Sequence, residues 1–318
     1  MLLRLLTPCI IFVLCGLVSP YVKAKSDIII ILDDLGYRPS DIAAFSLPKE
    51  VTFSILPQTP LASEIAQRAE KEGRAVMLHM PMQAQNGKNM GPLGLSTDMY
   101  AGAITHNVRR AMKSVPNAVG INNHMGSAFT GQREAMEALL KEVKRQGLFF
   151  VDSRTTVLSK GKEIAEQLGV PNASRQVFLD HRLEPAFLLQ QFNEMKRIAK
   201  REGRVLVIGH PHPATIDFLQ THLPLLEKEG FSLSSVADYF PDAPKVAKQF
   251  PNVHEQTAGL SHHIIASKNI ADKNITLKDI TLKNNLAFTN KVSSENLEHT
   301  RYSTRKVSPE ITDVAPNE

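Results

Sequence analysis

The sequence predicts an α/β fold, a distorted (β/α) barrel of seven or eight strands followed by a disordered C-terminal tail. Three observations lead to this prediction. Short β-branched runs alternate with amphipathic segments across residues 25–240. The first run, residues 28–32, is continuously apolar, as in a strand buried on both faces. The helical patterns also end repeatedly in glycine just before the next strand.

The alternation places each element in turn. We expect strands near residues 28–32, 51–56, 75–79, 118–121, 148–152, 176–180, 204–209 and 231–235. Helices are expected near residues 38–46, 60–72, 97–114, 131–146, 160–168, 184–202 and 214–229. The glycines expected to end helices are Gly73, Gly147, Gly169, Gly203 and Gly230. A long loop at residues 83–97 follows the third strand, either as a lid or substrate-binding loop or as a mobile loop without a role.

The two ends of the chain differ from its middle. Arg4, an apolar run at residues 5–18 and a small residue at Ala24 predict a signal peptide over residues 1–24, and hence export to the periplasm. The run is shorter than the roughly 20 residues that span a bilayer, so no membrane span is expected after the signal is removed. Residues 25–240 form the predicted catalytic domain. Residues 241–318, rich in Asn, Lys, Ser and Thr, are expected to be disordered.

Composition narrows the possible chemistry. Both cysteines, Cys9 and Cys15, lie in the predicted signal peptide, so neither disulfides nor thiolate ligands are expected in the mature chain. The net charge of +5 is modest for 318 residues, and no basic run interleaved with aromatic residues occurs. These features argue against nucleic acid as a partner.

Acidic and imidazole side chains gather where the predicted strands end. Because the carboxyl ends of barrel strands share one face, these residues are expected to form one site. Aspartate and histidine without cysteine suit zinc, and also nickel, cobalt or manganese. The strand-end residues are Asp33, Asp34, His79, His124, Asp152, Asp180, His210 and His212.

Three stretches carry most of these side chains. Asp33 and Asp34 can serve one site only if the backbone turns there, and Gly36 would supply that freedom. Residues 120–127, Gly-Ile-Asn-Asn-His-Met-Gly-Ser, predict a close approach of backbone to ligand or a tight loop capped by Asn side chains. In residues 208–215 prolines fix the backbone around His212, for a site or for a structural turn.

Together these motifs resemble the divergent polysaccharide deacetylase family of bacterial envelope proteins, a branch of the polysaccharide deacetylase superfamily. The resemblance covers about residues 27–240. It depends on five stretches: Asp33-Asp34, Leu78-His79-Met80-Pro81-Met82, the Asn-Asn-His run at residues 120–127, Val151-Asp152-Ser153 and Gly209-His210-Pro211-His212-Pro213.

The resemblance implies roles for individual residues. It makes Asp33 the general base and Asp34 a metal ligand. His79 matches the first histidine of the superfamily's His-x-x-x-His motif, whose second position is Gln83 here. We expect His124 to complete the set with Asp34 and His79.

The remaining implied roles concern the surroundings of the metal. The superfamily's Arg-x-Pro-x-Gly signature is replaced here by the Asn-Asn-His run. His210 is the expected general acid, with His212 in reserve. Amides around Asn122 and Asn123 would hold the oxyanion, and Asp152 or Asp180 would orient a histidine. With an aromatic content of 6% and no tryptophan, Tyr37 and Phe129 are the expected sugar contacts.

The predicted function is that of an exported hydrolase that depends on a divalent metal, expected to be zinc. It would remove N-acetyl or related amide-linked groups from an envelope carbohydrate such as peptidoglycan. One alternative is a catalytically weak glycan-binding or regulatory envelope protein that keeps the deacetylase fold. Another is a glycosidase that pairs Asp33 with Asp152 or Asp180.

Overall fold

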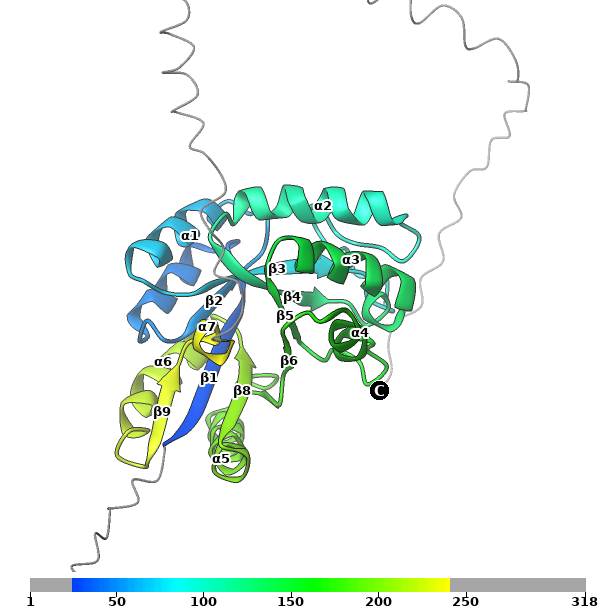
Figure 1. Ribbon diagram of the computed structural model, residues 1–318. Helices are drawn as coiled ribbons and strands as arrows, with labels where there is room; N and C mark the ends of the chain where they lie inside the picture. Colours follow the sequence, from blue (N-terminus) through cyan, green and yellow to red (C-terminus); the bar gives the residue numbers. More distant parts are fainter. Residues whose placement is uncertain (1–24, 241–318) are drawn as a thin grey trace, which may run out of the picture. The chain divides into compact units, whose positions relative to one another are not determined.

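The structure, a computed structural model, describes residues 25–240 (Figure 1). The predicted signal peptide at 1–24 and the predicted tail at 241–318 lie outside the described residues. Among the helices of residues 25–240, none combines the length and the hydropathy needed to span a membrane.

The strands form one sheet in which every pairing is parallel. Its order is β6-β5-β4-β3-β2-β1-β8-β7, and β9 pairs with the N-terminal half of β1. The strands are β1 (Ser26–Leu35), β2 (Thr52–Ile55), β3 (Val76–Met82), β4 (Ala118–Met125), β5 (Phe149–Asp152), β6 (Asn172–Ser174), β7 (Val177–Phe178), β8 (Arg204–Gly209) and β9 (Phe231–Ser234).

The sheet curls into a distorted, incompletely hydrogen-bonded barrel, which confirms the predicted fold class. Its two edge strands, β6 and β7, follow each other in the chain. Between them, the amide of Arg175 donates to the carbonyl of Asp152 in β5, and the amide of Gln176 donates to that of Leu206 in β8. The sequence predicted a single strand at 176–180, whereas only Val177–Phe178 pairs. Strand β6 was not predicted, because Asn-Ala-Ser is too short and polar to read as a strand.

The helices follow the predicted order. They are the 3₁₀ helix η1 (Pro39–Ser46), α1 (Ala62–Lys71), α2 (Ala101–Ser114), η2 (Phe129–Gly131), α3 (Arg133–Arg145), α4 (Gly161–Leu168), α5 (Pro185–Glu202), α6 (Pro213–His222), η3 (Leu223–Leu225) and α7 (Val236–Tyr239). The helix predicted at 214–229 divides into α6 and η3, since Pro224 cannot continue the α-helical hydrogen bonds. The five glycines expected to end helices all have a left-handed φ, between 66° and 85°.

Strand β1 is buried on both faces, as its sequence predicted. Ile28, Ile30 and Leu32 contribute to the core between the sheet and the helices, whereas Ile29 and Ile31 contribute to a second core. The second core also contains Phe149, on which Phe240 stacks at 4.4 Å. Because Phe149 begins β5, this packing lies at the end of the sheet opposite the strands' carboxyl ends.

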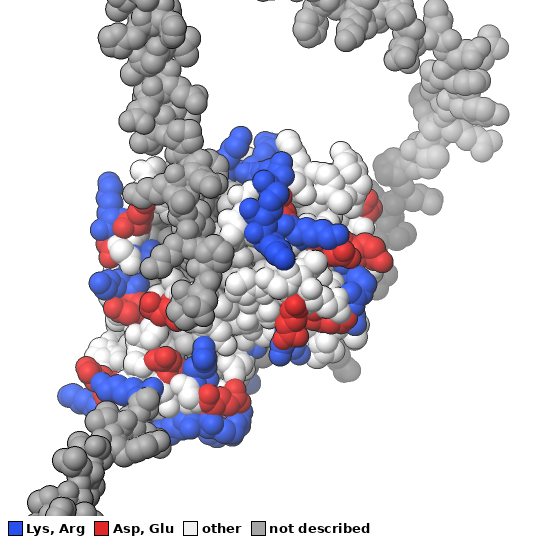
Figure 2. Space-filling model, in the orientation of Figure 1, with Lys and Arg blue, Asp and Glu red and all other residues white. Residues whose placement is uncertain are grey.

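Charged side chains pair across the outer helices. Figure 2 shows basic and acidic side chains interspersed on one face of the molecule. The clearest pairing centres on the buried carboxylate of Glu142 in α3, which contacts Arg109 of α2 at 2.9 Å and also Arg145. These contacts tie two neighbouring helices together on the outside of the sheet.

Candidate active site

The backbone of β1 turns at Asp34, and this turn brings both aspartates to one site. The register between β1 and β2 is interrupted between Leu32 and Leu35, and Asp34 has a left-handed φ of 62°. A short polar residue such as Asp tolerates this conformation better than most. Gly36, the predicted source of freedom, has a φ of 125°, and a Cβ atom there would lie 2.1 Å from the hydroxyl of Thr59. The turn therefore uses both positions.

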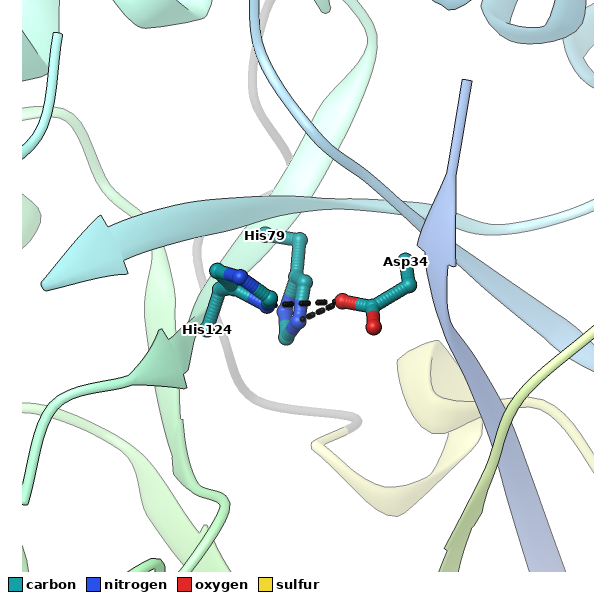
Figure 3. A group of neighbouring side chains, drawn as sticks. All are labelled: Asp34, His79 and His124. Atoms are coloured by element: carbon teal, nitrogen blue, oxygen red, sulfur yellow. Dashed lines mark ion pairs between the residues drawn. The ribbon is translucent and has the colours of Figure 1, made fainter. Parts of the chain in front are cut away.

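Three donor atoms from β1, β3 and β4 converge beside this turn (Figure 3). Oδ1 of Asp34 lies 2.7 Å from Nδ1 of His124 and 3.0 Å from Nε2 of His79. Among the residues described, no hydrogen bond of acceptable geometry reaches this buried oxygen. Two imidazoles and an unsatisfied carboxylate oxygen aimed at one point are what a divalent ion needs, so this donor set fits zinc.

The hydrogen bonds of His79 fix which of its nitrogens is free. Its Nδ1 lies 2.8 Å from Oδ1 of Asn122, whose Nδ2 donates to Oδ1 of Asp33 at 2.7 Å. An amide oxygen only accepts, so Nδ1 of His79 keeps its proton, and Nε2, which faces Asp34, is the nitrogen that can exchange a proton for a metal ion.

Electrostatics favour a positive charge at this point. Burial alone would lower the pKa of His79, but the charges of Asp33 and Asp34 outweigh it and raise the pKa to about 9. Burial opposes ionisation of Asp34, yet its contacts with His124 and His79 hold the pKa of that carboxyl well below its usual range. The cluster thus stabilises one added cation, either a proton or a metal ion.

His210 lies on the other side of Asp34. Its Nε2 is 3.8 Å from Oδ2 of Asp34, while its Nδ1 lies 3.0 Å from Oδ1 of Asp180. Burial lowers the pKa of His210, but the hydrogen bond and charge of Asp180, together with the charges of Asp33 and Asp34, outweigh this and raise it. The second oxygen of Asp180 accepts from the amide of His210 at 2.7 Å and from the hydroxyl of Thr215 at 2.8 Å. His210 is therefore rigidly oriented and disposed to carry a proton.

Asp33 is buried between these groups. Burial raises the pKa of its carboxyl, although the positive charges of His79 and His210 and the hydrogen bond from Asn122 act in the opposite direction. A carboxylate with a raised pKa is a better proton acceptor, which suits a general base.

Two of the predicted site residues, Asp152 and Asn123, form hydrogen bonds to loops and not to the histidines of the site. Asp152 accepts from the amide of Arg154 at 2.8 Å and from the hydroxyl of Ser159 at 2.7 Å. Asp180 is therefore the aspartate that orients a histidine, His210, whereas Asp152 holds the loop after β5. The side chain of Asn123 accepts from the amide of Ser153 and donates to the carbonyl of Met125, so it holds the chain after β4 and β5.

Three further residues complete the placement. His212 is the N-cap residue of α6 and forms a second group of possible ligands with Asp180 and His210, but both oxygens of Asp180 already accept hydrogen bonds. Phe129, expected to contact sugar, is fully buried and cannot do so, whereas Tyr37 is 50% exposed.

Gln83 lies where the superfamily's motif has a histidine, and it has a different task. Its Oε1 accepts from the amide of Thr97 at 2.8 Å and from the hydroxyl of Thr97 at 2.9 Å. It therefore fastens the two ends of the loop at residues 83–97. The donor group contains His124 instead.

Sequence reasoning missed two residues that support the site, Ser54 and Thr215. Both are fully buried and donate to side chains of the site, Ser54 to Asn122 and Thr215 to Asp180. A single hydroxyl inside an apolar strand or in a first helical turn carries no chemical signature. Only the fold reveals its partner.

Comparisons with known proteins agree with this architecture. The family model described as divergent polysaccharide deacetylase matches residues 30–240. An uncharacterized protein of Haemophilus influenzae is 37% identical over 209 residues, a match that covers 65% of this chain and 75% of that protein. The uncharacterized protein YibQ of Escherichia coli is 36% identical over 208 residues, and the match covers 65% of each chain.

A solved structure shares the fold. The crystal structure of an uncharacterized protein from Agrobacterium tumefaciens C58 superposes with a TM-score of 0.66 at 23% identity. The superposition covers 69% of this chain and 90% of that one. At this identity the likeness concerns the fold alone.

Proposed function

The chain belongs to the divergent polysaccharide deacetylase family, and from this we propose that it is an exported, metal-dependent hydrolase that removes N-acetyl or related amide-linked groups from a carbohydrate of the cell envelope. The observation that carries the proposal is the convergence of Asp34, His79 and His124 on one point, with Asp33 and His210 beside it. Export to the periplasm is proposed from the sequence of residues 1–24 alone.

Amide hydrolysis needs an activated water, a stabilised oxyanion and a proton for the departing amine. A divalent ion held by Asp34, His79 and His124 would polarise the acyl carbonyl and lower the pKa of water. Asp33 would accept a proton from the water that attacks the acyl carbon. Its burial and its single hydrogen bond from Asn122 keep one carboxylate oxygen oriented in the site.

His210 would act at the second step. When the carbon–nitrogen bond breaks, the amine nitrogen must gain a proton before it can leave as a free amine. The contact with Asp180 raises the pKa of His210, which favours the protonated imidazole that a general acid needs. Nε2 faces the site because Nδ1 is engaged by Asp180. The products are acetate and a free amino sugar.

Acetate release tests this function. We expect the purified protein, loaded with zinc, to release acetate and an equal amount of free amine from an N-acetylated glycan. Asp33→Asn should lower the rate by about 100-fold or more while zinc stays bound, because a positioned general base contributes about 10²–10⁴-fold. If the zinc-loaded wild type releases no acetate and nonetheless binds the glycan, the regulatory alternative holds instead.

A further inference from the structure

Asn122 contacts both the proposed metal ligand His79 and the proposed base Asp33. Its Oδ1 lies 2.8 Å from Nδ1 of His79, and its Nδ2 lies 2.7 Å from Oδ1 of Asp33. Its side chain is fully buried at the middle of β4, so water does not compete for these contacts. One amide group therefore connects two residues with different chemical tasks.

Two neighbours hold this amide, Ser54 at its oxygen and Asp33 at its nitrogen. The hydroxyl of Ser54, fully buried on β2, donates to Oδ1 of Asn122 at 2.6 Å. With the amide reversed, its oxygen would face the carboxylate of Asp33 and two acceptors would meet without a proton between them. Asp33 thus selects the orientation of the amide, and the hydroxyl of Ser54 holds its oxygen in place.

We propose that Ser54 and Asn122 are positioning residues that together orient His79 for metal binding and Asp33 for proton transfer. The oxygen of Asn122 holds the Nδ1 proton of His79, which leaves Nε2 as the metal-binding atom. The nitrogen of Asn122 holds Asp33 in place. Ser54 acts only through Asn122, since the hydrogen bond to Asn122 is its side-chain contact with the site. The part that concerns Asp33 depends on the proposed function, whereas the part that concerns His79 depends only on metal binding.

The chain offers a matched control for the loss of a hydroxyl. Ser174 in β6 also has a buried hydroxyl, but that hydroxyl has no hydrogen-bond partner among the described residues. Ser54→Ala and Ser174→Ala remove the same atom from two strands of the same sheet. Only Ser54→Ala releases the amide of Asn122.

Zinc affinity and the state of the His79 ring are the primary measurements. We expect Ser54→Ala and Asn122→Ala to weaken zinc binding about 10–100-fold in competition with a chelator, the usual effect of losing a residue that orients a metal-bound histidine. Ser174→Ala should stay within about 2-fold. Nitrogen NMR of the zinc-loaded wild type should show His79 protonated at Nδ1 and bound through Nε2. In Ser54→Ala this signal should broaden or shift.

Asn122→Asp separates the two contacts. The carboxylate still accepts from His79 and Ser54, so zinc binding should not weaken, but it places a second acceptor against Asp33. Acetate release should then fall about 10-fold or more with zinc retained. If acetate release in Asn122→Asp equals that of the wild type, the positioning of Asp33 is refuted.

The outcomes distinguish this proposal from the proposed function. Wild-type zinc affinity and an unchanged His79 signal in Ser54→Ala overturn the positioning role and leave the hydrolase intact. If the wild type itself binds no zinc, both proposals fail. If loss of the buried amide prevents Asn122→Ala from folding, Ser54→Ala is the deciding variant.

Discussion

Oδ1 of Asp34 lies 2.7 Å from Nδ1 of His124, so a histidine of β4 faces the aspartate that ends β1. The superfamily's second motif histidine would stand at position 83, directly after β3, the neighbour of β4 in the sheet. Here Gln83 binds Thr97 through its side chain. The third donor of the proposed metal centre has therefore moved one strand along the sheet.

This displacement predicts opposite results for two substitutions. His124→Ala should weaken zinc binding by more than about 100-fold, because a direct ligand should cost more than the roughly 10–100-fold lost with an orienting residue. Gln83→Ala should leave zinc affinity within about 2-fold. It should instead make the loop at residues 83–97 more accessible to protease. Equal zinc affinities for the two variants would contradict the assignment of His124.

Zinc affinity should depend on pH through His79. The pKa of about 9 means that His79 of the zinc-free protein binds a proton at pH 7, and zinc must displace it. The affinity should therefore rise about tenfold per pH unit between pH 6 and 8. Calorimetry in buffers of different ionisation enthalpy should detect about one released proton at pH 7. A zinc dissociation constant that does not change between pH 6 and 8 would contradict the raised pKa of His79.

The raised pKa of His79 also makes the stability of the zinc-free protein depend on pH, and this stability decreases where zinc affinity increases. A folded-state pKa raised above the ordinary 6.5 stabilises the fold fully below pH 6.5, and the effect disappears as the pH rises through about 9. In the absence of zinc, the stability gained by wild type over His79→Asn should accordingly shrink across this interval. Urea unfolding at a series of pH values measures the difference.

Asp180→Asn should affect catalysis more than Asp152→Asn. Asp180 holds Nδ1 of His210 and raises its pKa, so its loss should lower acetate release about 10–100-fold with zinc retained. The pKa of the acidic group in the rate profile should fall at the same time. Asp152→Asn makes the same chemical change at the end of β5 but alters only loop contacts. Similar losses of rate in both variants would contradict the distinction.

Glu142 should stabilise the fold in a pH-dependent way. Burial would raise the pKa of its carboxyl, but hydrogen bonds from Arg145, Arg109 and Gln146 lower it to about 2. Glu142→Gln should lower the free energy of unfolding at pH 7 by about 1.5–3 kcal/mol, the usual range for hydrogen bonds to a charged group. The folded-state pKa is depressed, so this stabilisation is present above pH 4.5 and lost as the pH falls toward 2.

Glu137 provides the control on the same helix. It pairs with Lys141 on the exposed side of α3. Because an exposed ion pair contributes little to stability, Glu137→Gln should unfold at the same urea concentration as the wild type. If both variants unfold at the same urea concentration, the contacts of Glu142 do not stabilise the fold as described.

The sequence predicted the barrel because its signals are local. Continuous β-branched runs, amphipathic segments and helix-ending glycines each act within a few residues, and all five such glycines adopt the expected left-handed φ. The errors fall where local signals are weak. Strand β6 is short and polar. The helix expected near residues 38–46 is present as the 3₁₀ helix Pro39–Ser46, a distinction that the sequence pattern does not make.

The sequence predicted which residues form the site better than it predicted which of them contact one another. Asp34, His79 and His124 could be placed together because parallel strands end on one face. The sequence left Asp152 and Asp180 equivalent, since both end strands. The choice between them depends on which loop bends toward His210, a long-range property. Ser54 was missed because nothing near it in the sequence indicates Asn122 as its partner.

Elemental analysis of the purified protein tests directly whether Asp34, His79 and His124 form a metal centre. We expect about one zinc ion per chain in the wild type, and no stoichiometric zinc in His79→Ala or Asp34→Ala variants that remain folded. An unchanged zinc content in both variants would contradict a metal centre built from Asp34, His79 and His124.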